Sequence, residues 1–154
     1  MLTESNVLGM NKDRLRLLRR TDFCDRDITL AEMIHVFTTF GALWVYPGDS
    51  RANTYHALLK SGLHSNGFCF SMLVLKESNL AEIFAYEIYK KTVKLYDKPI
   101  RWVIGPAYGA APLVYHLARF FQAVHALVEK DRDGQPTEWK RLVVERGESV
   151  LIMN

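Results

Sequence analysis

The sequence predicts an α/β protein in which helices flank a sheet of parallel strands. Its second half alternates helical and strand segments, and the strand candidates at 101–104, 123–128 and 150–153 are largely apolar runs without a polar alternation. Parallel sheets that are covered on both faces have this pattern. The chain has 154 residues, of which 49% are hydrophobic and 24% charged, a composition typical of one globular domain.

The first 40 residues are expected to be helical. Either Asp27 or Thr29 can cap a helix that runs to about Thr39, and Gly41 is suited to end it. The apolar side of this helix is expected to consist of Ile28, Met33, Ile34 and Phe37.

A small antiparallel element is expected between residues 42 and 72. Short strand candidates occupy 42–46, 55–60 and 68–72, and turn residues separate them. The strongest turn signal is the Pro-Gly-Asp-Ser run at 47–50. The sequence therefore predicts short paired strands between the helical start and the α/β half.

Helices and strands alternate from residue 78 onward. Asn79 and Glu82 are three positions apart and resemble a capping box, which starts a helix expected to run to about Tyr96. Residues 131–138 are polar and are expected to form a loop. The other expected elements are a strand at 101–104, a helix at 112–121, and strands at 123–128, 142–144 and 150–153.

The charge balance is mild and does not indicate a nucleic-acid partner. A net charge of +3 permits an anionic ligand. Five basic residues near the start are interpreted as the solvated face of an amphipathic helix, with a phosphate, membrane or partner contact as the alternative. These residues are Lys12, Arg14, Arg16, Arg19 and Arg20.

Nothing in the sequence indicates a membrane span, a secretory signal or a metal site. The longest uncharged run, 102–115, is short and is interrupted by glycine and proline. Cys24 and Cys69 fit a reducing compartment, and Cys69 is interpreted as a small strand residue rather than a nucleophile. The five histidines form no metal-binding pattern.

Ligands of parallel sheets bind at the carboxyl ends of the strands. The glycine-containing turn at 105–111 either presents backbone N–H groups to an anion or is simply a tight turn into the next helix. Lys130 follows a strand and is either an anion ligand or an ordinary surface lysine. Lys140 and Arg141 flank the polar loop, which is either a lid or a solvated hairpin.

Five motifs in register resemble those of orotate phosphoribosyltransferases, over about residues 40–154. Leu-Lys-Ser-Gly at 59–62 is followed by His64-Ser65 and by the aromatic residues Phe68 and Phe70. The other four are the Val-Ile-Gly-Pro-Ala-Tyr-Gly-Ala segment at 103–110, the strand at 126–131 that ends in Glu-Lys-Asp, the basic pair at 140–141, and the Gly-Glu-Ser-Val-Leu-Ile-Met segment at 147–153.

The resemblance implies a type I phosphoribosyltransferase fold, with N-terminal helices and a small hood in residues 1–77 and the core parallel sheet, flanked by helices, in residues 78–154. It implies transfer of ribose 5-phosphate from phosphoribosyl pyrophosphate to orotate, giving orotidine 5'-monophosphate and pyrophosphate in pyrimidine nucleotide biosynthesis. It further implies Mg²⁺ carried by the donor pyrophosphate, a cytoplasmic location and a homodimer.

The same resemblance implies roles for nine residues. Lys60 and Lys130 would be catalytic, with Lys60 meeting the orotate carboxylate or the donor. Phe68 and Phe70 would flank the planar base. The donor is polyanionic and needs cations and amides around it, and the residues implied for this are Ala107, Tyr108, Gly109, Lys130, Lys140 and Arg141.

The last residue departs from the family pattern. Asn154 stands where the family has the first of two acidic residues, which precede a Thr-Gly-Gly loop that binds the donor. The sequence therefore resembles an enzyme without its C-terminal part, and a chain that ends here is expected to be inactive. The alternatives are a non-catalytic ligand-binding or regulatory domain of this fold and another α/β nucleotide-related enzyme.

Overall fold

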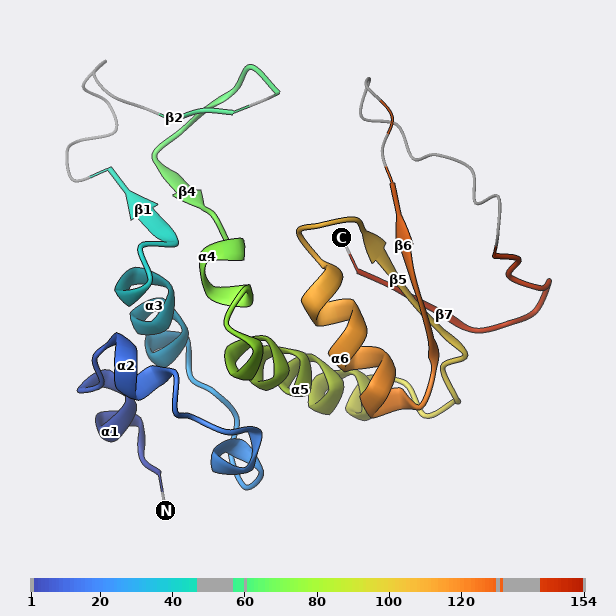
Figure 1. The fold of residues 1–154 in the computed structure, drawn as a ribbon, viewed down its shortest axis with the longest axis horizontal. Helices are drawn as coiled ribbons and strands as arrows, with labels where there is room; N and C mark the ends of the chain where they lie inside the picture. Colours follow the sequence, from blue (N-terminus) through green and yellow to red (C-terminus); the bar gives the residue numbers. More distant parts are fainter. Residues whose placement is uncertain (1, 47–56, 60, 130, 132–141, 154) are drawn as a thin grey trace.

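The computed structural model describes residues 2–46, 57–59, 61–129, 131 and 142–153. Helices occupy the N-terminal part, a thin arm of antiparallel strands follows, and a parallel sheet lies at the other end of the molecule (Figure 1). The turn expected at 47–50 and all but the first residue of the loop expected at 131–138 lie outside the described residues. The predicted α/β class is confirmed.

Short helices form the N-terminal part, and each of the three α-helices here has a side-chain N-cap. They are α1 (Glu4–Leu8), α2 (Lys12–Leu15) and α3 (Leu30–Thr39), with the 3-10 helix η1 (Arg20–Phe23) between α2 and α3. Thr29, one of two expected caps, accepts a hydrogen bond from the backbone N–H of Glu32 and forms a capping box with it. Ile34 was expected on the buried side but is 46% exposed, because the helix instead turns Glu32 and Val36 inward.

The basic residues at 12–20 do not share one helix face. They are distributed over α2, η1 and the segment between them, and several pack on aromatic rings. Arg16 forms two hydrogen bonds with Glu77, at 2.8 and 3.1 Å, and Arg20 lies 4.9 Å from the Tyr86 ring centre. Lys12 lies 5.0 Å from the Phe40 ring centre. The amphipathic-helix interpretation is corrected in this respect: these three cations join short N-terminal segments to the rest of the protein.

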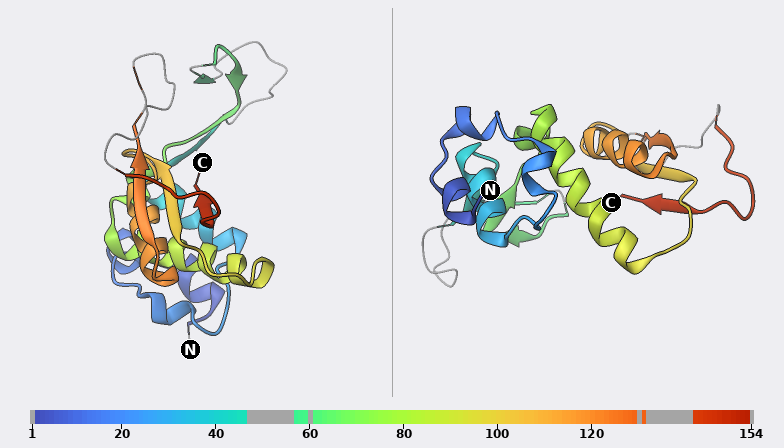
Figure 2. Two further views of the ribbon diagram at one scale, coloured as in Figure 1. Left: turned by 90° about the vertical axis from the view of Figure 1, so that its right-hand side faces the viewer. Right: turned by 90° about the horizontal axis from the view of Figure 1, so that it is seen from below.

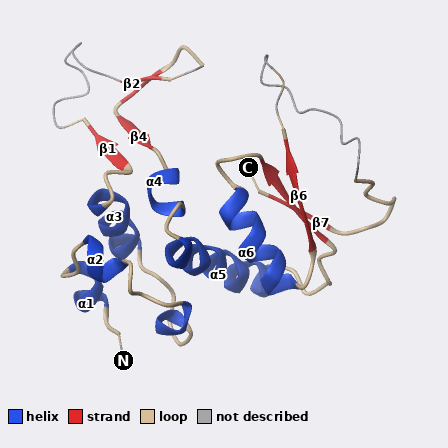
Figure 3. Cartoon of the chain, viewed as in Figure 1, coloured by secondary structure: helices blue, strands red, loops and turns tan. Residues whose placement is uncertain are grey.

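The expected antiparallel element is present as two small sheets. Strand β1 (Leu43–Val45) pairs with β4 (Gly67–Cys69), and β2 (Ala57–Leu58) pairs with β3 (His64–Ser65). Figure 3 shows these strands extending from the helical part as a thin arm. The strand predicted at 68–72 is wrong at its end, because Met72 begins the short helix α4 (Met72–Leu75). Residues of α4, Val74 and Leu75, are buried in the N-terminal core, which favours a helix over continued pairing at the edge of the arm.

Helix α5 (Ser78–Leu95) is shared by the two halves of the molecule. Seen from below, it runs between the N-terminal helices on one side and α6 with the sheet on the other (Figure 2). Leu80 and Phe84 pack into the N-terminal core, whereas Ala85 packs into the core under the sheet. The expected capping box is wrong: the Asn79 side chain donates to the carbonyls of Leu15 and Leu18, each at 3.1 Å, and so fastens α5 to the N-terminal segment.

The sheet has the strand order β6–β5–β7, and both of its pairings are parallel. Its strands are β5 (Trp102–Pro106), β6 (Val124–Val128) and β7 (Val150–Ile152), and α6 (Ala111–Phe121) connects β5 to β6. Helices α5 and α6 cover one face of the sheet. The core between these helices and the sheet contains Ala85, Val103, Val114, Leu117 and Ala118.

The opposite face of the sheet differs from the prediction. Among the described residues it carries Trp102, Ile104 and Ala126, and a returning segment rather than a helix packs on it through Val144. The strand expected at 142–144 is wrong, since these residues are in no strand. The Trp102 indole donates to Glu148 at 2.7 Å and holds the returning segment against β5. The expected division of the chain between residues 77 and 78 stays a prediction.

Candidate functional site

The carboxyl ends of the three parallel strands meet at one edge of the sheet. The backbone N–H of Ala107, just after β5, donates to the Val128 carbonyl at the end of β6 at 2.8 Å. The N–H of Met153, just after β7, donates to the Ile104 carbonyl at 2.7 Å. The turn that follows β5 is therefore fixed against both neighbouring strands, in the position where α/β proteins bind ligands.

The turn from Pro106 to Ala110 leads directly into α6. Tyr108 has a left-handed φ of 66°, which is uncommon for a residue other than glycine and is often found at functional sites. The N–H of Gly109 donates to Ala107 within the turn at 3.0 Å. The N–H groups of Tyr108, Ala110 and Ala111 have no hydrogen-bond partner among the residues that the structure describes.

The start of α6 adds a positive electrostatic contribution to this turn. Ala110 is the N-cap and has no side-chain oxygen to accept from the first turn, and Pro112 lies within that turn. Unpaired N–H groups and the helix dipole together favour an anion at such a position. The geometry is compatible with the anion-site interpretation of the turn, which stays a prediction.

Beside this turn lies a cavity of about 810 Å³. One side, which we call the strand-end rim, comes from the sheet edge and the residue before α4. The other side, which we call the helix wall, comes from α3, α4, α5 and α6 (Figure 1). The rim residues are Ser71, Pro106, Ala107, Tyr108, Gly109, Ala110, Val128, Glu129 and Met153, and the wall residues are Met33, Phe37, Leu75, Phe84, Glu87, Ile88, Lys91 and Leu113.

The buried charge of Glu87 in the helix wall is balanced by an ion pair. Glu87 is only 4% exposed, and its Oε1 lies 2.7 Å from Lys90 Nζ. Lys90 also contacts Asp27 at 2.9 Å and donates to the carbonyls of Phe23 and Arg26. Burial lowers the pKa of Lys90, but its hydrogen bonds to Glu87 and Asp27 outweigh burial and raise that pKa above its ordinary value. The ammonium therefore stays charged and offsets the Glu87 carboxylate beside the cavity.

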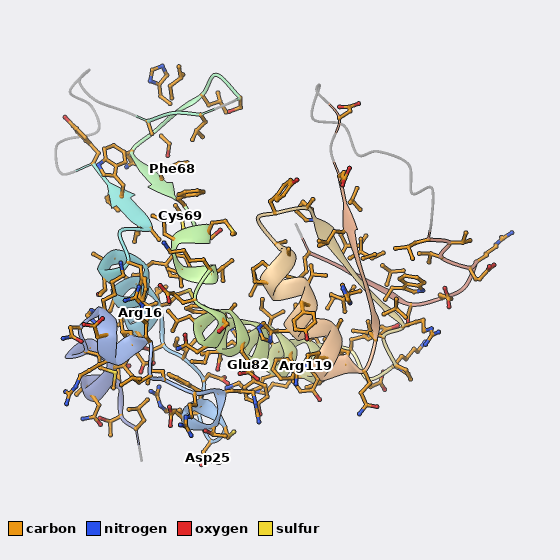
Figure 4. The ribbon with its side chains drawn as sticks, viewed as in Figure 1. Arg16, Asp25, Phe68, Cys69, Glu82 and Arg119 are labelled. Carbon is orange, nitrogen blue, oxygen red and sulfur yellow. The ribbon has the colours of Figure 1, made fainter. Side chains whose placement is uncertain are left out.

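The structure brings together three of the nine residues that the sequence predicted for the site. Ala107, Tyr108 and Gly109 line the cavity. Phe68 and Phe70 do not line it: both are about half exposed, and Figure 4 shows Phe68 and Cys69 on the arm, away from the sheet. Their role at the base stays a prediction. The other four, Lys60, Lys130, Lys140 and Arg141, lie outside the described residues.

The helix wall was missed by sequence reasoning. Met33 was interpreted only as a core residue, and Phe37 only as part of the apolar side of its helix. The signal for this wall in the sequence is the high number of large apolar residues at helical spacing in α3 and α5, such as Phe84 and Ile88. This pattern does not distinguish a cavity wall from a core, because both require apolar side chains at the same spacing.

Gly105 is the residue of β5 that allows the turn and α6 to approach the sheet closely. A Cβ atom at this position would lie 2.7 Å from Val114 Cγ2 and 3.2 Å from the Cβ atoms of Ala110 and Met153. We therefore expect Gly105→Ala to lower the free energy of unfolding by about 1–3 kcal/mol, as overpacked cores do. Urea denaturation measures this change.

Gly67→Ala is the matched control, because a Cβ atom there meets only the Trp44 carbonyl at an ordinary 3.5 Å. We expect this variant to be neutral or slightly more stable than the parent protein. Equal losses of stability in the two variants would contradict the close packing inferred at Gly105.

The described residues contain neither a candidate membrane-spanning helix nor a candidate metal site. None of the helices in the described part is long and apolar enough to cross a membrane. Within the same ranges, no three side chains of His, Cys, Asp or Glu are grouped so that they could hold a metal ion.

A parallel sheet whose first strand passes through a glycine-containing turn into a helix, preceded by a small antiparallel element, is consistent with a phosphoribosyltransferase-like α/β protein. The relatives that the sequence matches are orotate phosphoribosyltransferases. The chain is 36% identical over 98 residues to that of Caldicellulosiruptor bescii, which covers 64% of this chain and 50% of the relative. It is 37% identical over 100 residues to that of Caldicellulosiruptor saccharolyticus, covering 64% and 49%.

A more distant match has the same name. The orotate phosphoribosyltransferase of Helicobacter pylori is 33% identical over 97 residues, covering 63% of this chain and 47% of the relative. The chain thus spans about half the length of the curated relatives it matches. No protein-family model matches it. The family resemblance that the motifs predict is confirmed over this part of the relatives.

Proposed function

We propose that the protein acts as a phosphoribosyltransferase of the orotate type. The observation that carries this proposal is the cavity at the carboxyl ends of three parallel strands, where a fixed turn presents unpaired N–H groups at the start of α6. The names of the relatives indicate transfer of a phosphoribosyl group to orotate, and the family resemblance implies phosphoribosyl pyrophosphate as the donor.

In this reaction, the bond between the ribose C1 atom and the pyrophosphate oxygen breaks. A ring nitrogen of orotate bonds to C1 and loses its proton to water or to the departing pyrophosphate. Pyrophosphate leaves with the bonding electrons, so negative charge grows on it as positive charge grows on the ribose. In this proposal, the turn N–H groups of Tyr108, Ala110 and Ala111, which have no partner among the described residues, hold that leaving group, and the dipole of α6 favours its charge. Catalysis of this kind depends on positioning and electrostatics.

In this proposal, Mg²⁺ binds together with the donor pyrophosphate. Magnesium commonly binds substrate phosphates with one or two carboxylates and keeps several waters. Glu129 lies on the strand-end rim and would supply such a carboxylate. The ion would neutralise charge on the pyrophosphate, while the orientation of the donor depends on the turn.

The test combines binding with turnover. Isothermal titration with phosphoribosyl pyrophosphate and Mg²⁺ should show saturable binding that pyrophosphate competes away, and a mixture with orotate should lose orotate absorbance only when the donor is present. Binding without turnover would instead support the non-catalytic, ligand-binding domain. No binding of either phosphate compound would overturn the proposal.

Lys60 and Lys130 carry the implied catalytic charges. We expect Lys60→Ala and Lys130→Ala each to reduce turnover or donor affinity at least about tenfold, which corresponds to about 1.4 kcal/mol. The measurement is the same titration, extended to kcat/KM where turnover is present. Lys98→Ala, an exposed lysine after α5, is the control and should behave like the parent protein. Unchanged affinity and kinetics for one of the two variants would remove that lysine from the site.

A further inference from the structure

The two sides of the cavity differ in chemistry. The strand-end rim offers unpaired backbone N–H groups in the turn after β5. The helix wall is formed mainly by apolar side chains, and these are Met33, Phe37, Leu75, Phe84, Ile88 and Leu113. A site for phosphate alone needs only the rim, whereas pockets for organic ligands have volumes of about 300–1,000 Å³ and combine apolar walls with a few polar groups. At about 810 Å³ this cavity fits the second description.

The helix wall is suited to an aromatic ring. Phe37 and Phe84 lie edge to face, with ring centres 5.5 Å apart and an interplanar angle of 68°. Rings prefer this arrangement, and a further ring can pack on such a pair. Met33 and Ile88, on the same two helices, add flexible and branched apolar surface beside them.

A charged group does not fit against the apolar residues of this wall. The Glu87 carboxylate is buried there, and Lys90 already neutralises it at 2.7 Å. A second anion placed beside Glu87 would be repelled by it, and Lys91, the cation that also lines the wall, is exposed to solvent and lies outside its apolar part. The anionic part of a ligand is therefore directed to the rim, and its uncharged part to the wall.

We propose that Met33, Phe37, Phe84 and Ile88 form an apolar subsite that takes the uncharged aromatic ring of a ligand whose anionic group is held at the 106–110 turn. This inference rests on the proposed function for the binding of the anionic group at the turn. It adds that the uncharged part of the ligand is an aromatic ring. Residues of α3 thereby become specificity-determining, although α3 precedes the part of the sequence that carries the family motifs. Larger side chains on the wall should weaken the binding of aromatic anions selectively, without weakening the binding of phosphate itself.

The test compares 1-naphthyl phosphate with inorganic phosphate by fluorescence and calorimetric titration. We expect the parent protein to bind the aromatic ester at least about tenfold more tightly than phosphate. Met33→Trp and Ile88→Phe should remove this preference and leave phosphate affinity unchanged. Ile34→Trp and Val93→Phe, on exposed positions of the same helices, should retain it.

Two results would overturn the subsite: equal affinity of the parent protein for the two probes, or equal loss of the preference in the wall variants and in the exposed controls. Thermal unfolding of all four variants excludes misfolding as the cause of a loss. Failure of the proposed function has a different signature, because 1-naphthol would then still bind and lose affinity in Met33→Trp, while neither phosphate nor pyrophosphate would bind.

Discussion

Replacing Lys90 by methionine is expected to lower the free energy of unfolding by about 3–5 kcal/mol. The ammonium joins α5 to the segment before α3, through Asp27 at 2.9 Å and the carbonyls of Phe23 and Arg26 at 3.1 and 2.7 Å. Its removal leaves the buried Glu87 carboxylate without the cation at 2.7 Å. Chemical denaturation measures the loss, and pyrophosphate affinity should also fall, because an uncompensated negative charge then lies beside the cavity.

Lys94→Met is the matched control on the same helix. Its ammonium is 3.7 Å from Asp27, and its side chain is 66% exposed, so the expected change is at most about 1 kcal/mol. Adding Glu87→Leu to Lys90→Met should restore much of the lost stability, since the stranded carboxylate is then absent. Similar losses for the Lys90 and Lys94 variants would contradict the role given to the buried pair.

The sign of the pH dependence follows from the raised pKa of Lys90. A lysine whose pKa rises on folding stabilises the protein fully below its unfolded value of about 10.4, and this contribution fades as pH rises through the folded value. The difference between the parent protein and Lys90→Met should therefore be constant from pH 7 to about pH 10 and then shrink.

Replacing Arg26 by methionine is the second substitution with a large expected effect, again about 3–5 kcal/mol. Glu32 is fully buried, and Arg26 holds both of its carboxylate oxygens, at 2.6 and 2.8 Å. Thr29 donates its backbone N–H to the same carboxylate at 2.8 Å, so Glu32 also fixes the start of α3. Because α3 carries Met33 and Phe37, the loss should also disturb the helix wall of the cavity.

A pH titration distinguishes this pair from ordinary packing. Burial raises the pKa of Glu32, but the hydrogen bonds from Arg26 and Thr29 outweigh burial and lower that pKa below its ordinary value. A lowered carboxyl pKa stabilises the folded state above the unfolded value of about 4.3 and ceases to do so as pH falls through the folded value. The deficit of Arg26→Met should be largest near neutral pH and should shrink as the pH falls below about 4.3. A deficit that does not change with pH would contradict the ion pair.

The parts of the fold that the sequence predicts best are those in which local pattern and tertiary packing agree. The helices at 30–39, 78–95 and 111–121 and the three parallel strands were expected within a few residues, because apolar periodicity and turn residues coincide there. The predictions are wrong where a contact between residues far apart in the sequence determines the local structure. Asn79 was expected to cap its own helix but donates to two carbonyls more than 60 residues away.

The turn of the candidate site was predictable, and the cavity beside it was not. A glycine turn between a strand and a helix is a local signal. Ala107, Tyr108 and Gly109, for which the resemblance implied a binding role, line the cavity, and that role stays a prediction. The helix wall depends on how α3 and α5 approach one another, which no local pattern encodes. The ion pair between Lys90 and Asp27, which joins α5 to the segment before α3, also links segments that the sequence does not show to be neighbours.

The most direct test of the central claim, that the turn after β5 binds an anion, is a titration of the isotopically labelled protein with pyrophosphate and Mg²⁺, followed by amide NMR. The predicted result is saturable chemical-shift change centred on the N–H groups of Tyr108, Gly109, Ala110 and Ala111. Shifts confined to the arginines of the N-terminal segment, or no saturable shift in the turn at millimolar pyrophosphate, would contradict it.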